Sequence, residues 1–376
     1  MNRYYNPVRT LEGPGSLSSL PEILNGMEPD SRRILLLVWS EEVLKNPAFS
    51  FLLDQKSGFQ TLPFSFQASN PTVEQLFETY EATKEFAPAV VIAVGGGSIM
   101  DVGKSLCCLY GHSLSNVDAL RELIVTKAYG TPAARWIGIP TTAGTGSETT
   151  CWATIWDPSQ DAKRSVECHE NYAWAAVVDS DLTKGMPLKL AVSSGLDAAA
   201  HGVESYWAKG TNCVSRAMAL SAIRMIMENM EGLLAGRETA REAMARGSMM
   251  AGLAFSNTKT TACHSISYPL TMHYSIPHGA AVSMLLSPLL KRNLPATEGS
   301  EALLNALGVS DGDELTRKIR RILKASGQPS TLKEWGVKKE DLPRLAALGM
   351  TKGRADNNPV AIDVPMIQEI LEEIYE

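Results

Sequence analysis

Short apolar runs alternate with amphipathic stretches through the first half of the chain. Candidate buried strands lie within residues 32–40, 89–97, 135–148 and 174–182. Between the first two runs, VEQLFETYEATKEF (73–86) repeats its apolar residues at helical spacing. Strands that alternate with helices predict βαβ units and a parallel sheet.

The pattern changes near residue 184. From Met186 onward the chain has long helical stretches rich in alanine and methionine, such as VSRAMALSAIRMIMENMEGLLAG. We therefore expect an α/β domain at residues 1–183 and an all-α domain at residues 184–376. A chain of 376 residues is long enough to bury two separate cores.

The amino-acid composition limits the kinds of molecule that the protein is expected to bind. Hydrophobic residues make up 44% of the chain and charged residues 20%, which is an ordinary globular balance. The net charge of −6 argues against nucleic acid or an anionic membrane as a partner. No run is apolar and long enough to span a membrane, and the first residues lack a signal-peptide core. The six cysteines form no CxxC pair, so we expect reduced thiols in a soluble, cytoplasmic protein.

Two glycine-containing loops follow predicted strands. VIAVGGGSIMDVGKSL runs from an apolar strand through Gly95, Gly96 and Gly97 into a helix opened by Ser98. Free N–H groups at a helix start favour a phosphate, although this loop alone equally fits a plain strand–turn–helix connection. PTTAGTGSE (140–148) supplies hydroxyls after the next strand. Because ligands of open parallel sheets collect at the carboxyl ends of the strands, the two loops together predict a bound nucleotide.

One carboxylate and three histidines indicate a metal site. Asp197 and His201 lie four residues apart in a helical stretch, so their side chains share one face. Such a pair is more often a helix-start aspartate and an incidental histidine. Adding His264 and His278 gives a plausible ligand set for a first-row divalent ion. An ion of this kind can polarise a carbonyl oxygen as a Lewis acid.

The ordered motifs GGGSIMDVGK, PTTAGTGSE, DAAAHGVES and H-x13-H ending in PHG resemble those of the iron-containing (group III) alcohol dehydrogenases. YYNPVRTLEGPGSL near the N-terminus and SNPT at 69–72 are also similar, and the resemblance covers nearly the whole chain. It implies a dinucleotide-binding α/β domain, a helical C-terminal domain and an active site in the cleft between them. It also implies NAD(P)(H)-dependent interconversion of alcohol and aldehyde in a homodimer or larger oligomer.

The resemblance also implies particular site residues. The metal, Fe²⁺ or alternatively Zn²⁺, would be held by Asp197, His201, His264 and His278. The pyrophosphate would bind Gly95 to Ser98, with Asp101 and Lys104 alongside. The further cofactor residues would be Thr141, Thr142, Thr145, Ser147, Asn70 and Lys163.

Two positions depart from the family's pattern. Members commonly have aspartate after the second strand, where it receives the adenosine ribose, but Ser40 stands there, beside Glu41. Serine would not repel a 2′-phosphate, so the cofactor is either NAD(H) or NADP(H). The serine slightly favours tolerance of NADPH. Members also read H-x3-H-P-L, whereas here Tyr268 replaces the second histidine. With a reference pKa of about 10, Tyr268 fits a proton relay or a packing residue equally well.

A basic residue stands near the candidate metal ligands. Lys259 precedes His264 by five residues, where members of the family have small or apolar side chains. It fits either a solvated surface lysine or a cation for an anionic substrate, with Thr258, Thr260 and Thr261 as hydroxyl donors. Arg354, near Asn357 and Asn358, is a second basic candidate.

TKTTA, SYPLT, IPHG and GRADNNP look like the phosphonoacetaldehyde reductase branch of the family. That resemblance implies reduction of phosphonoacetaldehyde to 2-hydroxyethylphosphonate. The candidate catalytic residues are then Tyr268 and Lys259, and the substrate residues are Lys259, Arg354 and Thr258. A dianionic phosphonate suits lysine, arginine and hydroxyl donors. The alternatives are a general short-chain alcohol dehydrogenase of the same family and a dehydroquinate synthase-like lyase, which uses NAD transiently.

Overall fold

The computed structural model describes residues 3–27, 31–160, 162–351 and 353–376, which form two compact units. The α/β unit comprises Asn6–Thr142 and Ser147–Leu182. The helical unit comprises Thr183–Glu376, Ala143–Gly146 and the N-terminal residues through Tyr5. Within the described residues, every helix is too short or too polar to cross a membrane.

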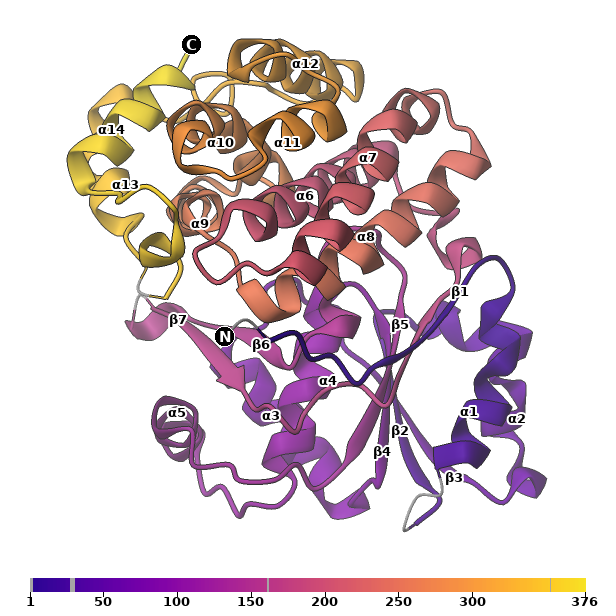
Figure 1. The fold of residues 1–376 in the computed structure, drawn as a ribbon. Coiled ribbons are helices and arrows are strands. Elements are labelled where there is room, and N and C mark those ends of the chain that lie inside the picture. Colours follow the sequence, from indigo (N-terminus) through magenta and orange to yellow (C-terminus); the bar gives the residue numbers. More distant parts are fainter. Residues whose placement is uncertain (1–2, 28–30, 161, 352) are drawn as a thin grey trace. The chain divides into compact units, whose positions relative to one another are not determined.

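The α/β unit is built on a six-stranded sheet in the order β1-β8-β5-β4-β2-β3, and all neighbouring strands are parallel (Figure 1). The strands are β1 (Arg9–Glu12), β2 (Arg33–Val38), β3 (Gln60–Ser65), β4 (Val90–Gly95), β5 (Arg135–Pro140) and β8 (Ala175–Val178). The four apolar runs in the sequence correspond to β2, β4, β5 and β8. The edge strands β1 and β3 are largely exposed or half-buried and therefore lack an apolar run.

Helices cover both faces of this sheet (Figure 1). They are α1 (Leu20–Met27), α2 (Ser50–Leu53), α3 (Val73–Thr83), α4 (Gly97–Leu109) and α5 (Val117–Thr126). Along β2, Ile34 and Leu36 pack in the core with α1 and α2, whereas Leu35 and Leu37 pack in the core with α3, α4 and α5. A strand buried on both faces needs apolar residues at every position, which explains the sequence RILLLV.

An antiparallel hairpin of β6 (Trp152–Asp157) and β7 (Ala162–Glu167) lies beside α4. The Asp101 carboxylate on α4 accepts a hydrogen bond from Thr154 N at 3.0 Å, which ties the hairpin to the helix. Several residues of both strands are only half-buried, and the hairpin was absent from the strands predicted by apolar runs.

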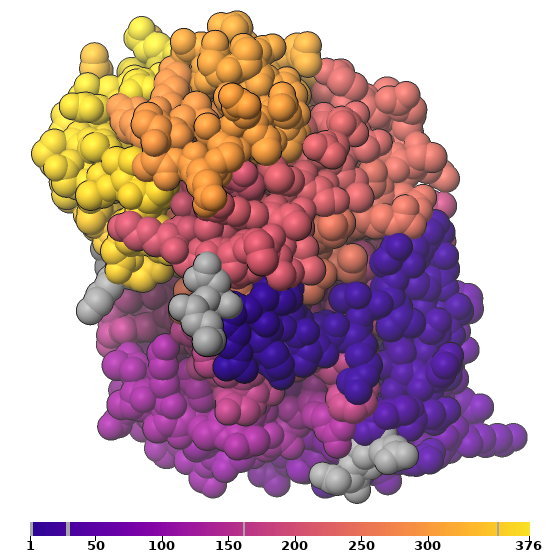
Figure 2. Space-filling model, in the orientation of Figure 1, coloured from indigo at the N-terminus to yellow at the C-terminus, as the bar shows by residue number. Residues whose placement is uncertain are grey.

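The helical unit has one continuous apolar core. Its helices are α6 (Leu188–Trp207), α7 (Cys213–Leu234), α8 (Glu238–Thr258), α9 (Ala262–Tyr274), α10 (His278–Asn293), α11 (Ser300–Leu307), α12 (Gly312–Ala325), α13 (Leu342–Leu348) and α14 (Val364–Glu373). In Figure 2 the surfaces of the orange and yellow C-terminal segments adjoin, as the packing of α10 on α12 and α14 requires. The prediction of a parallel-sheet domain followed by a helical domain is confirmed.

A glycine sets how closely α7 and α8 approach. A Cβ added to Gly247 on α8 would lie 2.6 Å from Ile226 Cγ1 on α7. Any larger residue would push these helices apart, because packed cores have little free space. The helix α6 also packs on both α7 and α8.

Candidate functional site

Asp197, His201 and His264 come together in the core of the helical unit. Asp197 and His201 lie one turn apart on α6, and His264 lies in the first turn of α9. Their candidate ligand atoms all lie within 4.8 Å of one another, and all three residues are buried. We call Asp197, His201 and His264 the metal group. It is the one such group among the residues that the structure describes.

Two atoms of the metal group lack partners. His264 Nε2 lies 3.4 Å from Asp197 Oδ1, and both atoms are buried without a hydrogen-bond partner. Leaving buried polar atoms unpaired is costly. A divalent cation bound by both atoms would remove that cost, and a carboxylate with neutral imidazoles is a normal donor set for such a cation. The residues present therefore fit a divalent metal.

His278 lies at the edge of the metal group. It is the first residue of α10, and its Nε2 lies 3.9 Å from Asp197 Oδ1. Its ring meets that of His264 edge-on, with centroids 5.3 Å apart. The following residue, Gly279, permits this position, since a Cβ there would lie 2.0 Å from Ser193 O on α6. The three histidines of the predicted ligand set thus converge on Asp197.

Glu204 orients His264, and sequence reasoning missed it. Its fully buried carboxylate accepts a hydrogen bond from His264 Nδ1, which leaves Nε2 directed at Asp197. Its other oxygen accepts from Thr261 Oγ1 at 2.8 Å and from Cys263 N at 2.7 Å. Carboxylates commonly fix metal-binding histidines in this way. The spacing in the sequence could have indicated it, because Glu204 lies seven residues after Asp197 and hence on the same face of α6.

Burial and neighbouring charges set the protonation of these residues. Burial lowers the pKa of His201 to about 4, which keeps its imidazole neutral and able to bind a metal. Burial raises the pKa of Glu204, but the charge of His264 and hydrogen bonds outweigh this effect and lower it to about 2. The neighbouring histidines likewise lower the pKa of Asp197 against the effect of burial. Both carboxylates are therefore anionic at neutral pH.

Tyr268 contacts both His278 and a basic side chain. Its ring stacks on that of His278, with centroids 5.9 Å apart and planes 11° apart. Arg354 Cζ lies 5.8 Å from the centroid of the same ring, and Arg354 Nη1 donates a hydrogen bond to Thr260 Oγ1. Burial raises the pKa of Tyr268, so its hydroxyl stays protonated and can donate.

The three threonines of the segment 258–261 differ in surroundings. Thr258 Oγ1 donates to Ser205 Oγ at 3.1 Å, and Thr261 Oγ1 donates to Glu204. Both side chains are buried, and both hydroxyls are bonded within the fold. Thr260 is the hydroxyl that accompanies Arg354, while the Lys259 side chain is exposed. The structure thus pairs a basic group with Thr260, whereas Thr258, a predicted substrate residue, bonds Ser205.

In the α/β unit, the first glycine-rich loop joins β4 to α4 and meets neighbouring loops. Gly95 ends β4, Gly96 precedes the helix and Gly97 opens it. Ser98 Oγ accepts from Asn70 N at 3.1 Å, and Gly95 O accepts from Thr141 N at 3.0 Å. A Cβ on Gly96 would lie 3.3 Å from Thr142 Oγ1. The predicted cofactor residues Asn70, Gly95, Gly96, Gly97, Ser98, Thr141 and Thr142 therefore lie at one edge of the sheet.

Asp101, Lys104 and Ser147 form a bonded cluster. Lys104 is fully buried, and its Nζ donates to Ser147 Oγ at 2.7 Å, Thr150 Oγ1 at 2.9 Å and Trp152 O at 2.8 Å. Ser147 Oγ donates in turn to Asp101 at 2.9 Å. All three ammonium protons of Lys104 are thus used inside the unit. These contacts give the three residues a role in holding α4 to the 147–152 segment.

The remaining predicted cofactor residues are Ser40, Lys163 and Thr145. The Ser40 hydroxyl accepts from Glu42 N at 3.3 Å and caps a short 3₁₀ helix after β2. Lys163 Nζ lies 5.4 Å from the centroid of the Trp156 ring. Thr145 is half-buried and belongs to the helical unit, next to Gly144, whose carbonyl lies 3.3 Å from His201 Nδ1.

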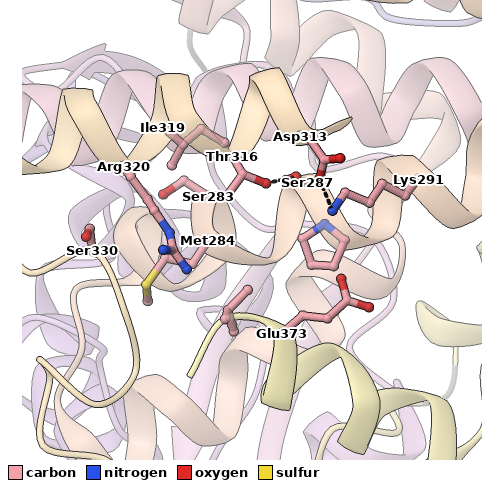
Figure 3. Close-up of a pocket in the computed structure, with 12 residues that line it drawn as sticks. Ser283, Met284, Ser287, Lys291, Asp313, Thr316, Ile319, Arg320, Ser330 and Glu373 are labelled. Atoms are coloured by element: carbon pink, nitrogen blue, oxygen red, sulfur yellow. Dashed lines mark hydrogen bonds and ion pairs between the residues drawn. The ribbon is translucent and has the colours of Figure 1, made fainter. Parts of the chain in front are cut away.

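A cavity of about 160 Å³ lies among α10, α12 and α14 of the helical unit (Figure 3). Two pairs of its polar groups bond each other: Lys291 bonds Asp313 at 2.5 Å, and the Ser287 hydroxyl meets that of Thr316 at 2.5 Å. Arg320 and Glu373 pair with groups outside the lining. None of the predicted site residues lines it. Charges paired in this way offer little to a ligand, so the metal group remains the candidate functional site.

Comparison with protein families gives two matches along the chain. A family model described as iron-containing alcohol dehydrogenase matches residues 7–180. A model described as the Fe-containing alcohol dehydrogenase family, C-terminal, matches residues 191–375. Together the two matches include every predicted site residue.

Individual proteins agree with these matches. The NAD-dependent methanol dehydrogenase of Bacillus methanolicus is 31% identical over 343 residues, which cover 88% of this chain and 87% of the relative. The NADPH-dependent butanol dehydrogenase of Clostridium saccharobutylicum is 29% identical over 81% of each chain. Among solved structures, the sulfoacetaldehyde reductase of Bifidobacterium kashiwanohense in complex with NAD⁺ superposes with a TM-score of 0.87. It is 26% identical, and the match covers 100% of this chain and 98% of that one.

Proposed function

The chain belongs to the iron-containing alcohol dehydrogenase family, and we propose that it uses this chemistry to reduce a short aldehyde with an anionic tail. As a member of that family it is an NAD(P)-linked oxidoreductase acting on alcohols or aldehydes. The substrate that fits best is phosphonoacetaldehyde, which would be reduced to 2-hydroxyethylphosphonate by hydride from the nicotinamide.

The position of Arg354 beside Tyr268, whose ring also stacks on that of His278, carries this proposal. Arg354 Cζ lies 5.8 Å from the centroid of the Tyr268 ring, and the centroid of the His278 ring lies 5.9 Å from the same point. In the proposal, an aldehyde held near His278 by its carbonyl directs its charged tail at the guanidinium. Arginine binds phosphonate or sulfonate oxygens through paired N–H groups. The similarity to a sulfoacetaldehyde reductase supports a two-carbon aldehyde with an anionic group.

Phosphonate is favoured over sulfonate by the number of basic groups. The exposed Lys259 lies next in sequence to Thr260, which accepts a hydrogen bond from Arg354. Two cations can balance a dianionic phosphonate, whereas a sulfonate carries a single charge and needs only one. Lys259 and Arg354, with the Thr260 hydroxyl, are therefore the proposed phosphonate-binding residues.

The side chains near the metal group have distinct proposed roles. Asp197, His201, His264 and His278 would hold a divalent metal, with Fe²⁺ preferred and Zn²⁺ acceptable. Such an ion, when bound, supplies a Lewis acid for the carbonyl oxygen. Glu204 holds His264 in the orientation that directs Nε2 at Asp197. Tyr268, protonated and buried, would donate a hydrogen bond to the oxygen that gains a proton during reduction.

For the cofactor we propose the edge formed by Gly95 to Ser98 with Thr141 and Thr142. The N-terminus of α4 presents backbone N–H groups to a pyrophosphate there. The position of Ser40 after β2 favours acceptance of NADPH as well as NADH, because it adds no negative charge at the adenosine ribose. The relatives include one enzyme named for NAD and one named for NADPH. We also propose a cytoplasmic homodimer or larger oligomer.

A substrate panel tests the proposal. The Fe²⁺- and Zn²⁺-loaded enzyme is assayed for NADH and NADPH consumption with phosphonoacetaldehyde, sulfoacetaldehyde, a carboxylate aldehyde and propanal. We expect the highest kcat/KM with phosphonoacetaldehyde, and we expect Arg354→Ala to abolish this preference. Equal turnover of propanal would instead identify a general short-chain alcohol dehydrogenase. A reaction without net consumption of NAD(P)H would indicate the lyase alternative.

A further inference from the structure

Lys259 has a backbone conformation that side chains rarely adopt. It follows α8 directly, with φ of 60° and ψ of 179°. This region of the φ/ψ map is essentially restricted to glycine, because a Cβ clashes with the backbone there. A non-glycine residue keeps such a conformation only where its surroundings enforce it.

Asn357 supplies that enforcement. Its Nδ2 donates to Thr258 O at 2.8 Å and to Thr260 O at 3.1 Å, which are the carbonyls on either side of Lys259. Its Oδ1 accepts from Gly210 N at 3.4 Å. Both donors of one amide are thus used on the carbonyls of the residues before and after the strained residue. We call Thr258, Lys259, Thr260 and Asn357 the Asn357 clamp.

The Asn357 clamp also fixes where two basic side chains begin. Asn357 ends a short 3₁₀ helix, Ala355–Asn357, whose N-cap is Arg354. The Arg354 guanidinium donates to Thr260 Oγ1, so the segments 258–260 and 354–357 bond through both backbone and side chain. A change in the backbone of Lys259 would therefore alter the direction of its ammonium relative to the Arg354 guanidinium.

We propose that Asn357 is a positioning residue that holds Lys259 in its strained conformation, so that Lys259 and Arg354 bind one phosphonate together. This inference rests on the proposed function and deepens it, since it names the residue that builds the anion subsite. A lysine with no role here would be replaced by glycine with a gain in stability. The strain is explained if the ammonium is needed at this point and a relaxed backbone would direct it elsewhere.

A stability experiment tests the clamp without any substrate. Lys259→Gly and Lys259→Ala are compared in the wild-type and Asn357→Ala backgrounds, because glycine relieves the strain and alanine does not. We expect the glycine variant to unfold about 2 to 4 °C above the alanine variant in the wild-type background. The gap should disappear in the Asn357→Ala background, where residue 259 can relax. Asn357→Asp, which lacks the two donors but keeps the shape, serves if Asn357→Ala does not fold.

Ser275 provides a matched control. It is exposed, follows α9 directly and has a positive φ of 53°, but it belongs to a separate turn. The gap between Ser275→Gly and Ser275→Ala should be the same in both backgrounds. The clamp is refuted if the Lys259 variants show no gap, or if their gap persists when Asn357 is replaced.

A kinetic experiment tests the subsite. Asn357→Asp should lower the ratio of kcat/KM for phosphonoacetaldehyde to that for propanal by about ten-fold or more, through KM rather than kcat. Methylphosphonate, used as a competitive probe, should lose affinity in parallel. An unchanged ratio would overturn the subsite. If the wild-type enzyme itself prefers propanal, the proposed function fails. The stability experiment still decides whether Asn357 holds Lys259 in its strained conformation.

Discussion

The carboxylate of Glu204 holds Nδ1 of His264, and this contact leaves His264 Nε2 3.4 Å from Asp197 Oδ1. Because the orientation of a metal-binding imidazole depends on such a partner, we predict that Glu204→Gln weakens metal binding about 10- to 100-fold. The measurement is equilibrium competition for Zn²⁺ or Co²⁺ against a chelator, followed by metal analysis.

Glu298→Gln is the control for this change. Glu298 pairs with Arg216 at 2.5 Å through a largely exposed side chain and should leave metal affinity as it is. If Glu204→Gln binds metal as tightly as the parent protein, the carboxylate serves packing alone.

Removal of the metal should lower the stability of the protein. The metal group keeps two unpaired buried atoms that a cation would satisfy, so binding favours the folded state. At a free metal concentration 100 times the Kd, the gain is about 2.7 kcal/mol. Thermal unfolding is followed during titration with Zn²⁺ after chelation. A resident metal would be contradicted if Zn²⁺ changed the unfolding midpoint of neither the parent protein nor Asp197→Ala.

Replacement of Tyr268 separates its two interpretations. If its hydroxyl assists proton transfer to the substrate oxygen, Tyr268→Phe should lower kcat by about 100-fold and leave KM for the aldehyde nearly unchanged. The phenyl ring can still stack on His278, so metal content should be retained. Steady-state kinetics with parallel metal analysis gives both quantities. Full turnover by Tyr268→Phe would leave Tyr268 as a packing residue.

A buried acid in the α/β unit should make stability depend on pH. Burial raises the pKa of Glu148 from 4.5 to about 7. Since the folded pKa lies above the unfolded one, this contribution is fully present below pH 4.5 and is lost as pH rises through 7. The loss is about 3 kcal/mol above that range. Urea unfolding from pH 4 to pH 9 should show this slope in the parent protein and a smaller one in Glu148→Gln. If the parent protein and Glu148→Gln had the same slope, burial would not raise the pKa of Glu148.

Ser40 should influence the choice of cofactor. Ser40→Asp places a carboxylate after β2, where we expect the adenosine ribose, and should raise KM for NADPH about ten-fold relative to NADH, by repulsion of the 2′-phosphate. Aspartate is also a good cap, so the hydrogen bond from Glu42 N can persist. Ser40→Asn has the same shape without the charge and should change the ratio little. An equal effect of both substitutions would place the ribose elsewhere.

The central sheet could be predicted because its strands are buried on both faces. In β2, β4 and β5 apolar residues occupy nearly every position, and the alternation with helices then predicts parallel strands. The edge strand β1 and the β6–β7 hairpin lack this signal. Their side chains are partly exposed, and their pairing depends on residues far away in sequence, such as Asp101 for β6.

The candidate site was predictable where ligands share a helix. The spacing of Asp197 and His201 places both on one face of α6, and the motif resemblance supplied His264 and His278. Glu204 was missed because its partner His264 lies 60 residues away, a relationship that only the fold displays. Lys104 shows the converse, since a lysine near a glycine-rich loop suggests a phosphate ligand, yet its three hydrogen bonds lie inside the unit.

The close approach of Gly279 to Ser193 has a consequence for assembly. His278 reaches Asp197 only when the start of α10 has docked on α6, and His264 does so only when α9 has begun beside Glu204. Since no single helix carries more than two of the four predicted ligands, a complete coordination sphere forms only after three helices have packed. A complete set of the four predicted ligands therefore requires α6, α9 and α10 to have packed together.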